Sequence, residues 1–418
     1  MSKFVIEGGY PLQGEICVQG AKNSVLPLLA ASLLVEGETV LHNCPRISDV
    51  ETALAILRHL GCRTQWQGHT IVVDARSLTC QCIPDELMRQ MRSSVMFLGP
   101  MLARCGQLDM VYPGGCSLGA RPIDLHLTAM REMGVEVEEE GGNIHCRRAA
   151  LQGCDLYLPF PSVGATENIM LLASACPGKT RIINAAREPE IVDLQRFLQA
   201  IGMEVSGAGD SVIRLEGAPR QRRVEFTVMP DRIAAQTYLA AAAITGGSVC
   251  VQGANPMDML AGLKVLEKSG CQVESRERAV CLRAPARLRS VPPIKTQPHP
   301  GFPTDAQAIF MSMLTVARGT SVVVENVFES RFGHAEGLRR MGADLNVLGR
   351  ICVVSGVEQL HGARVCAGDL RAGAALTVAA LAAKGRSEVH GLTHIDRGYE
   401  QMENTLGALG ARIERAEQ

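Results

Sequence analysis

Residues 55–66 read AILRHLGCRTQW, an apolar helical pattern that ends at Gly61 and passes directly into an alternating strand pattern. The same pattern recurs five more times, with its glycine at Gly134, Gly202, Gly270, Gly342 and Gly410. Successive glycines are separated by 73, 68, 68, 72 and 68 residues. Glycine is typical of the position just after a helix, where the backbone becomes left-handed. The chain is therefore predicted to contain six copies of one unit.

Each copy also contains a second helical segment that is apolar and rich in alanine, followed by a glycine and a strand. These segments lie at residues 20–34, 91–106, 162–178, 230–247, 304–319 and 370–385. Helices that are apolar on all sides are buried. The pattern predicts an α/β fold of βαβαββ units with helices inside and sheets outside. We expect two similar domains of three units, one over 22–229 and one over 1–21 plus 230–418, with an active-site cleft between them.

The composition excludes several classes of protein. The chain has 418 residues, a formal net charge of −1 and only 4% aromatic residues, so neither a global field nor stacking platforms favour nucleic acid. The start, MSKFVIEGGY, does not resemble a signal peptide, and no apolar stretch is long enough to cross a membrane. We expect a cytoplasmic protein that does not insert into membranes. The sequence gives no prediction of the oligomeric state.

The cysteines form no familiar framework. There are 15, without a CxxC pair, and only Cys80 and Cys82 are close in sequence. This pattern predicts neither disulfides nor a zinc site, and most cysteines are expected to be small buried apolar residues. We expect no metal and no organic cofactor.

Charged residues gather at corresponding positions of the repeats, where helices begin. Five cations stand out: Lys22, Arg92, Arg121, Arg371 and Arg397. Helix N-termini attract anions, and arginines bind phosphate and carboxylate groups through paired hydrogen bonds. The pattern indicates a site for a small ligand of high charge density, such as phosphoenolpyruvate.

Two further residues suit catalysis in such a site. Cys116 lies in the glycine-rich turn of VYPGGCSLGARPIDLHL, residues 111–127, where nearby cations would lower the pKa of its thiol. Asp305 lies at a helix start, where it could cap the helix or serve as a general base. By contrast, ASACPGKT at 173–180 follows the phosphate-loop pattern only loosely. It stands in the order helix, turn, strand, so we do not expect a nucleoside triphosphatase.

The sequence resembles the UDP-N-acetylglucosamine 1-carboxyvinyltransferases, enolpyruvyl transferases of the EPSP synthase-like family. The resemblance runs from GAKNSVLPLLAASLL through PGGCSLGARPIDLHL, PSVGATENIM, NAAREPEI, FPTDAQ and DLRAGAAL to HIDRGYE. It implies an inside-out α/β barrel in each of two domains. It also implies transfer of the enolpyruvyl group of phosphoenolpyruvate to the 3'-hydroxyl of UDP-N-acetylglucosamine, the first committed step of peptidoglycan biosynthesis.

The resemblance also implies roles for individual residues. Cys116 would protonate the vinyl carbon and be the target of fosfomycin, and Asp305 would be the base for the sugar hydroxyl. Lys22 and Arg397 would join them in catalysis. Phosphoenolpyruvate would be bound by Lys22, Asn23, Arg92, Arg121, Arg371 and Arg397. The sugar nucleotide would be bound by Asn23, Arg92, Arg121, Pro122, Ile123, Asp124, Leu125, Ser162, Val163, Gly164, Asp305 and Val327.

The match departs from the family pattern at three places: residues 234–236, the FESRF segment at 328–332, and Gly368. None removes a residue with an implied chemical role, but they leave open which paralogue this chain is. Two alternatives from the same fold remain, a catalytically silent UDP-sugar-binding paralogue and a 3-phosphoshikimate 1-carboxyvinyltransferase. A cysteine-based redox protein is a further alternative, and the lack of a CxxC partner weighs against it.

Overall fold

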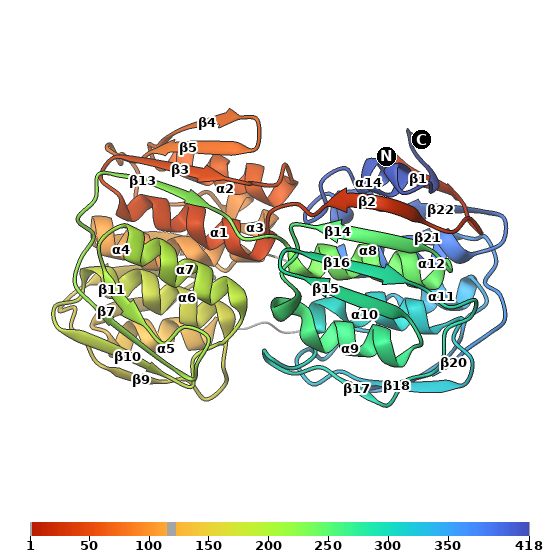
Figure 1. Ribbon diagram of the computed structural model, residues 1–418. Coiled ribbons are helices and arrows are strands. Elements are labelled where there is room, and N and C mark those ends of the chain that lie inside the picture. The colour runs from red at the N-terminus through yellow and green to blue at the C-terminus, as the bar shows by residue number, and fades with distance from the viewer. Residues whose placement is uncertain (1, 115–122, 418) are drawn as a thin grey trace. The chain divides into compact units, whose positions relative to one another are not determined.

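The computed structural model describes residues 2–114 and 123–417, which form two compact units. The first unit comprises residues 20–114 and 123–229, and the second unit comprises residues 2–19 and 230–417. Strand β2 (Gln13–Cys17) lies in the second unit because it pairs in parallel with β14 (Ser248–Gln252). Strand β13 (Arg223–Thr227) likewise closes the first unit by pairing with β3 (Glu38–His42). In each unit, sheets surround central helices (Figure 1).

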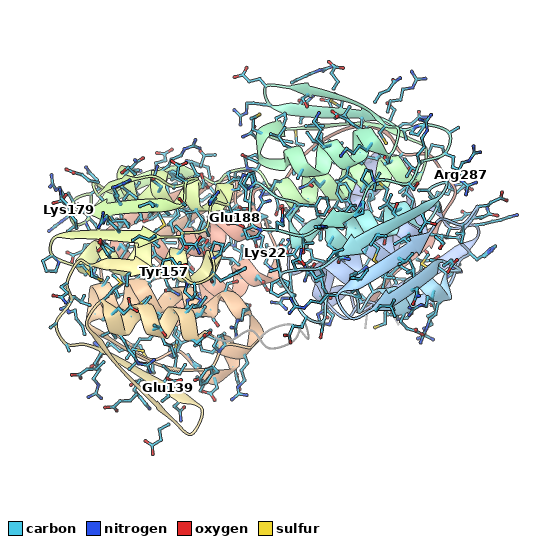
Figure 2. All side chains as sticks on the ribbon, turned by 90° about the horizontal axis from the view of Figure 1, so that it is seen from below. Lys22, Glu139, Tyr157, Lys179, Glu188 and Arg287 are labelled. Atoms are coloured by element: carbon cyan, nitrogen blue, oxygen red, sulfur yellow. A yellow bond between two sulfur atoms is a disulfide. The ribbon has the colours of Figure 1, made fainter. Side chains whose placement is uncertain are left out.

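The described part of the first unit has three outer sheets, with strand orders β13-β3-β5-β4, β11-β12-β10-β9 and β6-β8-β7. Their remaining strands are β4 (Arg63–Gln67), β5 (Thr70–Asp74), β6 (Gln107–Val111), β7 (Val135–Glu140), β8 (Asn143–Arg148), β9 (Asp155–Tyr157), β10 (Lys179–Ile183), β11 (Glu204–Ser206) and β12 (Val212–Glu216). Charged side chains such as Glu139 and Lys179 project from these outer strands (Figure 2).

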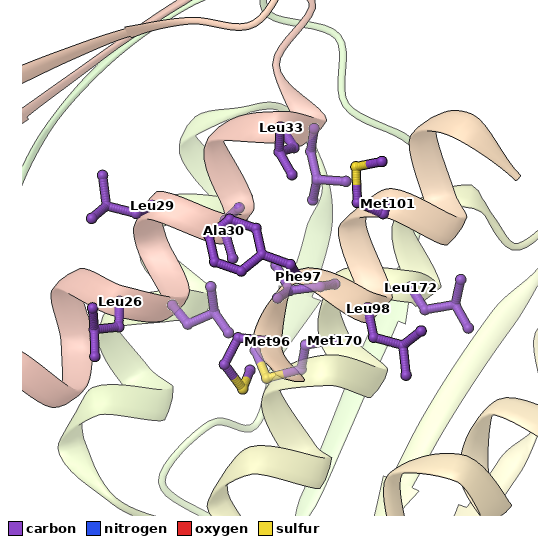
Figure 3. Packing of buried hydrophobic residues seen from close by; sticks show 14 of the residues in the cluster. Leu26, Leu29, Ala30, Leu33, Met96, Phe97, Leu98, Met101, Met170 and Leu172 are labelled. Carbon is purple, nitrogen blue, oxygen red and sulfur yellow. The ribbon is translucent and has the colours of Figure 1, made fainter. Parts of the chain in front are cut away.

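The helices of the first unit include a buried set, formed by α1 (Lys22–Ala31), the 3-10 helix η2 (Arg92–Phe97), α4 (Leu98–Cys105) and α6 (Val163–Leu172). The others are η1 (Ser32–Leu34), α2 (Ser48–His59), α3 (Asp85–Gln90), α5 (Asp124–Glu132), η3 (Ala173–Ala175) and α7 (Pro189–Ala200). Leu29, Phe97 and Met170 come from three different helices of the buried set and meet in one core (Figure 3). Gly99 allows close packing of α4 on α6, since a Cβ there would lie 2.6 Å from the carbonyl oxygen of Asn168.

The second unit repeats this arrangement, with strand orders β21-β22-β1-β23, β15-β16-β14-β2 and β17-β18-β20-β19. The additional strands are β1 (Ser2–Glu7), β15 (Gln272–Arg276), β16 (Ala279–Arg283), β17 (Ile294–Lys295), β18 (Thr320–Val324), β19 (Asp344–Leu348), β20 (Ile351–Ser355), β21 (Arg364–Cys366), β22 (Arg386–His390) and β23 (Arg412–Glu417). The central helices are α8 (Arg232–Ile244), α10 (Thr304–Leu314) and α12 (Leu370–Ala382), which contact one another. The outer helices are η4 (Pro256–Met259), α9 (Leu260–Lys268), α11 (Ala335–Arg340), α13 (Leu392–Ile395) and α14 (Met402–Ala408).

The predicted fold class, an α/β fold of repeated units with buried helices and outer sheets, is confirmed. In five sheets, the strand after the buried helix pairs in parallel with an edge strand and antiparallel with a second strand. That second strand belongs to a hairpin in four of these sheets, whereas in the fifth it is β1, which pairs with β23 from the other end of the chain. In the sixth sheet, the strand after the buried helix is β6, which pairs antiparallel with β8. Among the described residues, its parallel pairing is limited to a single bridge between Cys82 and Asp109. All six repeat glycines have positive φ, from +91° to +105°, as a helix C-terminus requires.

The expectations about cysteines need correction. A disulfide joins Cys250 to Cys281, because the antiparallel pairing of β14 with β16 places these residues directly opposite one another. Among the described free cysteines, six are buried: Cys44, Cys62, Cys146, Cys176, Cys271 and Cys352. Burial raises the pKa of Cys44 and Cys146 to about 12, so these thiols are inert.

Two further expectations concern the loose phosphate-loop pattern and membrane-spanning helices. The segment 173–180 runs from η3 through a turn into β10, the reverse of the strand–loop–helix order of a phosphate loop. Over the residues that the structure describes, no helix is both long and apolar enough to span a bilayer.

Candidate active site

Lys22 is the first residue of α1, and it forms a buried ion pair. Its Nζ lies 2.6 Å from Oδ2 of Asp49, in the first turn of α2, and the two side chains are 11% and 3% exposed. The pair fixes the ammonium group at the start of the helix, beside the half-buried Asn23. The sequence indicated Lys22 but not Asp49, because the partner comes from a different helix 27 positions later.

Arg92 begins η2 and lies near a buried histidine that the sequence did not indicate. Burial and then the charge of Arg92 lower the pKa of His126 to about 3, so the imidazole is neutral. Its Nδ1 lies 2.9 Å from the amide nitrogen of Asn168 and accepts a hydrogen bond, which leaves the proton on Nε2. The ring lies against Gly164, where a Cβ would be 3.1 Å from Nε2. His126 therefore supports the start of α6.

The start of α6 presents the three residues implied to bind the diphosphate. Ser162 is the N-cap, and its hydroxyl accepts a hydrogen bond of 3.4 Å from the N–H of Ala165. Val163 and Gly164 follow as the first helical residues, and all three are half-buried. A helix N-terminus of this kind attracts the negative charge of a phosphate.

The segment implied to bind uridine is described only in part. Ile123 is buried, and Asp124 and Leu125 are the first two residues of α5. Cys116, Arg121 and Pro122 lie outside the described residues.

In the second unit, Asp305 is held between two arginines. It is the second residue of α10, and its oxygens Oδ1 and Oδ2 accept hydrogen bonds of 2.9 Å each from Arg331 and Arg371. Burial raises the pKa of the Asp305 carboxyl, but the charges of Arg371 and Arg331 together lower it by more. Asp305 is therefore a carboxylate at neutral pH, with 29% of its side chain exposed.

Arg371 is fixed by its surroundings as well as by Asp305. It lies in the first turn of α12, where Asp369 is the N-cap and accepts from the N–H groups of Arg371 and Ala372. An Nη1 of Arg371 also lies 3.3 Å from the hydroxyl of Tyr399, which in turn lies 2.8 Å from Thr237. These contacts hold the guanidinium at the start of the helix.

Glu325 organises the loop that carries Val327. Its Oε1 accepts from the N–H groups of Val327 and Phe328 at 2.8 and 3.0 Å, and its Oε2 accepts from the hydroxyl of Thr304 at 3.0 Å. This buried carboxylate ties the Val327 loop to the start of α10, one residue before Asp305. The sequence did not indicate this role, because Thr304 lies 21 positions before Glu325.

Arg397 follows α13 and is half-buried. Its neighbour Asp396 is paired with Arg415 at 2.7 Å, so the negative charge beside Arg397 already has a basic partner.

A small hollow lies between Arg232 and Pro303, lined also by residues 257–261 and 299–301. It is located just before the helix that carries Asp305.

The departure at residues 234–236 lies in the core. These residues belong to α8, and Gln236 is fully buried. Its amide nitrogen donates to the carbonyl of Arg232 at 3.0 Å, and its oxygen approaches Gly262 of α9. The Gln236 side chain fits against α9 because Gly262 has no Cβ.

The EPSP synthase (3-phosphoshikimate 1-carboxyvinyltransferase) family profile matches residues 6–406. The UDP-N-acetylglucosamine 1-carboxyvinyltransferase 2 of Caldanaerobacter subterraneus subsp. tengcongensis is 48% identical over 415 residues, which cover 99% of this chain and 100% of that protein. The UDP-N-acetylglucosamine 1-carboxyvinyltransferase of Nitratidesulfovibrio vulgaris is 48% identical over 416 residues, 99% of each chain.

Solved structures show the same fold. The enolpyruvyl transferase NikO from Streptomyces tendae superimposes with a TM-score of 0.90 at 23% identity, over 99% of both chains. The EPSP synthase of Acinetobacter baumannii has a TM-score of 0.77 at 20% identity, over 100% of both chains. The chain therefore belongs to the EPSP synthase family and, within it, to the UDP-N-acetylglucosamine 1-carboxyvinyltransferases.

Proposed function

We propose that this enzyme transfers the enolpyruvyl group of phosphoenolpyruvate to the 3'-hydroxyl of UDP-N-acetylglucosamine and releases phosphate. The observation that carries the proposal is 48% identity along almost the whole chain to relatives named for this reaction. The carboxylate between two arginines at Asp305 supports it, since the reaction needs both a base and anion-binding groups.

The proposed reaction begins with a proton on C3 of phosphoenolpyruvate, because the electron-rich double bond of an enol phosphate is a poor electrophile until that carbon is protonated. Cys116 would donate this proton, and the sugar oxygen would then attack C2 while Asp305 accepts the hydroxyl proton. The tetrahedral intermediate would next expel phosphate and lose a proton from C3, which restores the double bond. Atoms balance, because one alcohol and one phosphoenolpyruvate give one enol ether and one phosphate.

The cations would stabilise the charge that moves during this reaction. Lys22, Arg92 and Arg121 of the first unit and Arg371 and Arg397 of the second would bind the phosphate and carboxylate groups. Asn23 would contact the reacting centre. Val163 and Gly164 would bind the diphosphate through their backbone N–H groups. The proposal thus requires residues of both units to act on the same pair of substrates.

Arg371 would also connect substrate binding to base strength. While Arg331 and Arg371 both bond to Asp305, they lower the pKa of its carboxyl, which makes it a weak base. An incoming phosphate or carboxylate would compete for the Arg371 guanidinium. Weakening the bond from Arg371 would raise the pKa of Asp305, so the base would strengthen only when phosphoenolpyruvate is present.

Phosphate release tests the proposal. We expect release from phosphoenolpyruvate only when UDP-N-acetylglucosamine is added, with Asp305→Asn reducing kcat about 10²–10⁴-fold. Asp344→Asn, on the exposed strand β19, serves as the control and should retain full activity.

Two other results would favour the alternatives. Release that depends on shikimate 3-phosphate would identify the chain as the sister transferase. UDP-sugar binding without any phosphate release would indicate the silent paralogue. Since both proposed substrates are small cytoplasmic metabolites, we place the reaction in the cytoplasm.

A further inference from the structure

Three side chains of metal-binding type gather in the first unit, and none of them is among the residues assigned to the reaction. His59, Cys80 and Cys82 each bring one donor atom to within 4.8 Å of the other two. The Sγ of Cys80 lies 3.4 Å from Nε2 of His59 and 3.3 Å from Sγ of Cys82. His59 and Cys82 are exposed and Cys80 is half-buried, so solvent reaches the cluster.

The backbone holds two of these residues close together. His59 is the last residue of α2, and the carbonyl of the next residue, Leu60, accepts a hydrogen bond of 2.9 Å from the N–H of Thr79. The chain can approach this closely because Gly61 has no Cβ, and a Cβ there would lie 2.7 Å from Oγ1 of Thr79. Cys80 therefore emerges beside His59 as a consequence of the fold.

The third residue is fixed by the edge of a sheet. Cys82 forms the single parallel bridge to Asp109 of β6, and the bonds Asp109 N–H to Gln81 and Ile83 N–H to Asp109 are 3.0 and 3.2 Å. In the other five sheets this place is taken by a regular parallel edge strand. Here a strand shortened to one bridge presents two cysteines, one on each side of Gln81.

The donor set suits zinc. Two thiolates and one imidazole are ligands that Zn²⁺ prefers, and bond lengths of about 2.3 Å to sulfur and about 2.0 Å to nitrogen predict about 3.8 Å between sulfurs and about 3.5 Å between sulfur and nitrogen in a tetrahedron. The distances of 3.3 and 3.4 Å are close to these values. His59 also lies at the C-terminal end of a twelve-residue helix, where the helix dipole favours a cation.

We propose that His59, Cys80 and Cys82 form a zinc site with two thiolates, one imidazole and a fourth position open to solvent. Binding would release the thiol protons to solvent and would join the end of α2 to the segment that leads into α3 and η2. The sequence did not predict this site, because His59 lies 21 positions before Cys80.

Cobalt binding to the reduced, metal-free full-length protein tests the site directly, without any substrate. We expect one Co²⁺ per chain with a thiolate-to-cobalt charge-transfer band, displaced by one equivalent of Zn²⁺. Cys80→Ser/Cys82→Ser should abolish the band. His59→Gln should weaken cobalt binding by more than about tenfold, because loss of a residue that merely supports a metal ligand already costs about tenfold. Cys17→Ser/Cys366→Ser removes two exposed thiols elsewhere and should bind like wild type.

Thermal unfolding provides an independent measurement. Zn²⁺ should raise Tm in the wild type and in the Cys17/Cys366 control, but not in Cys80→Ser/Cys82→Ser, because only a folded site binds the ion. The proposal would be overturned if the reduced wild type gave no charge-transfer band. It would equally be overturned if the Cys80/Cys82 variant bound cobalt as tightly as wild type.

Discussion

Arg371 and Asp305 lie 66 positions apart in the chain, yet Nη2 of Arg371 lies 2.9 Å from Oδ2 of Asp305. Both residues stand in the first turn of a central helix of the second unit, α12 and α10 respectively. Arg331, in the loop before α11, donates a hydrogen bond to the other carboxylate oxygen, Oδ1. The proposed base is therefore charged and held in one orientation before any substrate binds.

Removing Arg331 should shift the pH dependence of the reaction. Because Arg331 helps to lower the pKa of Asp305, the variant Arg331→Gln should raise that pKa, and more of the base will be protonated at a given pH. The acidic limb of the kcat/KM profile should move to higher pH by about one to three units. Arg340→Gln, at an exposed pair with Glu336, is the control. A lower kcat/KM with an unmoved limb would contradict this account of Arg331.

The Lys22–Asp49 pair should make separate contributions to stability and activity. Lys22→Met leaves Asp49 buried without its ammonium partner and should cost about 3–5 kcal/mol of unfolding free energy. Adding Asp49→Asn removes the uncompensated charge and should recover most of the lost unfolding free energy. Neither variant has the Lys22 ammonium group, so neither should show transferase activity. Denaturant unfolding and phosphate release measure the two effects. Lys264→Met breaks an exposed pair and should change stability by less than about 1 kcal/mol. Activity restored in the double variant would exclude Lys22 from catalysis.

The parts of the fold that could be predicted from the sequence are those encoded locally. The helix–glycine–strand pattern places each turn within a few residues, and the caps at Asp231 and Asp369 lie next to the helices that they begin. For the same reason, the sequence correctly indicated that Lys22, Arg92 and Asp305 lie at helix starts.

The partners of those residues could not be predicted, because they come from other segments. Asp49 reaches Lys22 from the next helix, and Arg331 reaches Asp305 from a loop. The Cys250–Cys281 disulfide depends on the register of two strands, which the sequence does not specify. Local patterns thus locate the functional groups, whereas tertiary contacts determine their charge and orientation.

His126 is buried in its neutral form, and this should make the stability of the folded protein depend on pH. Its pKa is about 3 in the folded chain and 6.5 when free, so the folded state binds fewer protons and is destabilised as pH falls below about 6.5. Between pH 7 and pH 4.5 this single group should cost about 2–3 kcal/mol. His126→Gln should lose that part of the pH dependence, as measured by urea unfolding at both pH values. An equal decrease in wild type and variant would show that His126 does not titrate on unfolding.

The substitution of Gly262 tests how Gln236 is accommodated. In the wild type, Gly262→Ala would place a Cβ 1.9 Å from Oε1 of Gln236, and this crowding should destabilise the protein by about 1–3 kcal/mol. In a Gln236→Ala background the clash with Gln236 is removed, and Cζ of Phe310 is then the nearest contact, at 3.2 Å from the Cβ position. The same change should therefore be close to neutral, because the better helix propensity of alanine offsets the remaining crowding. Urea unfolding of the four proteins gives the coupling energy. Since both residues lie in the core, kcat and KM should stay near wild type throughout. A loss of activity with Gln236→Ala would instead connect this departure from the family pattern to the reaction itself.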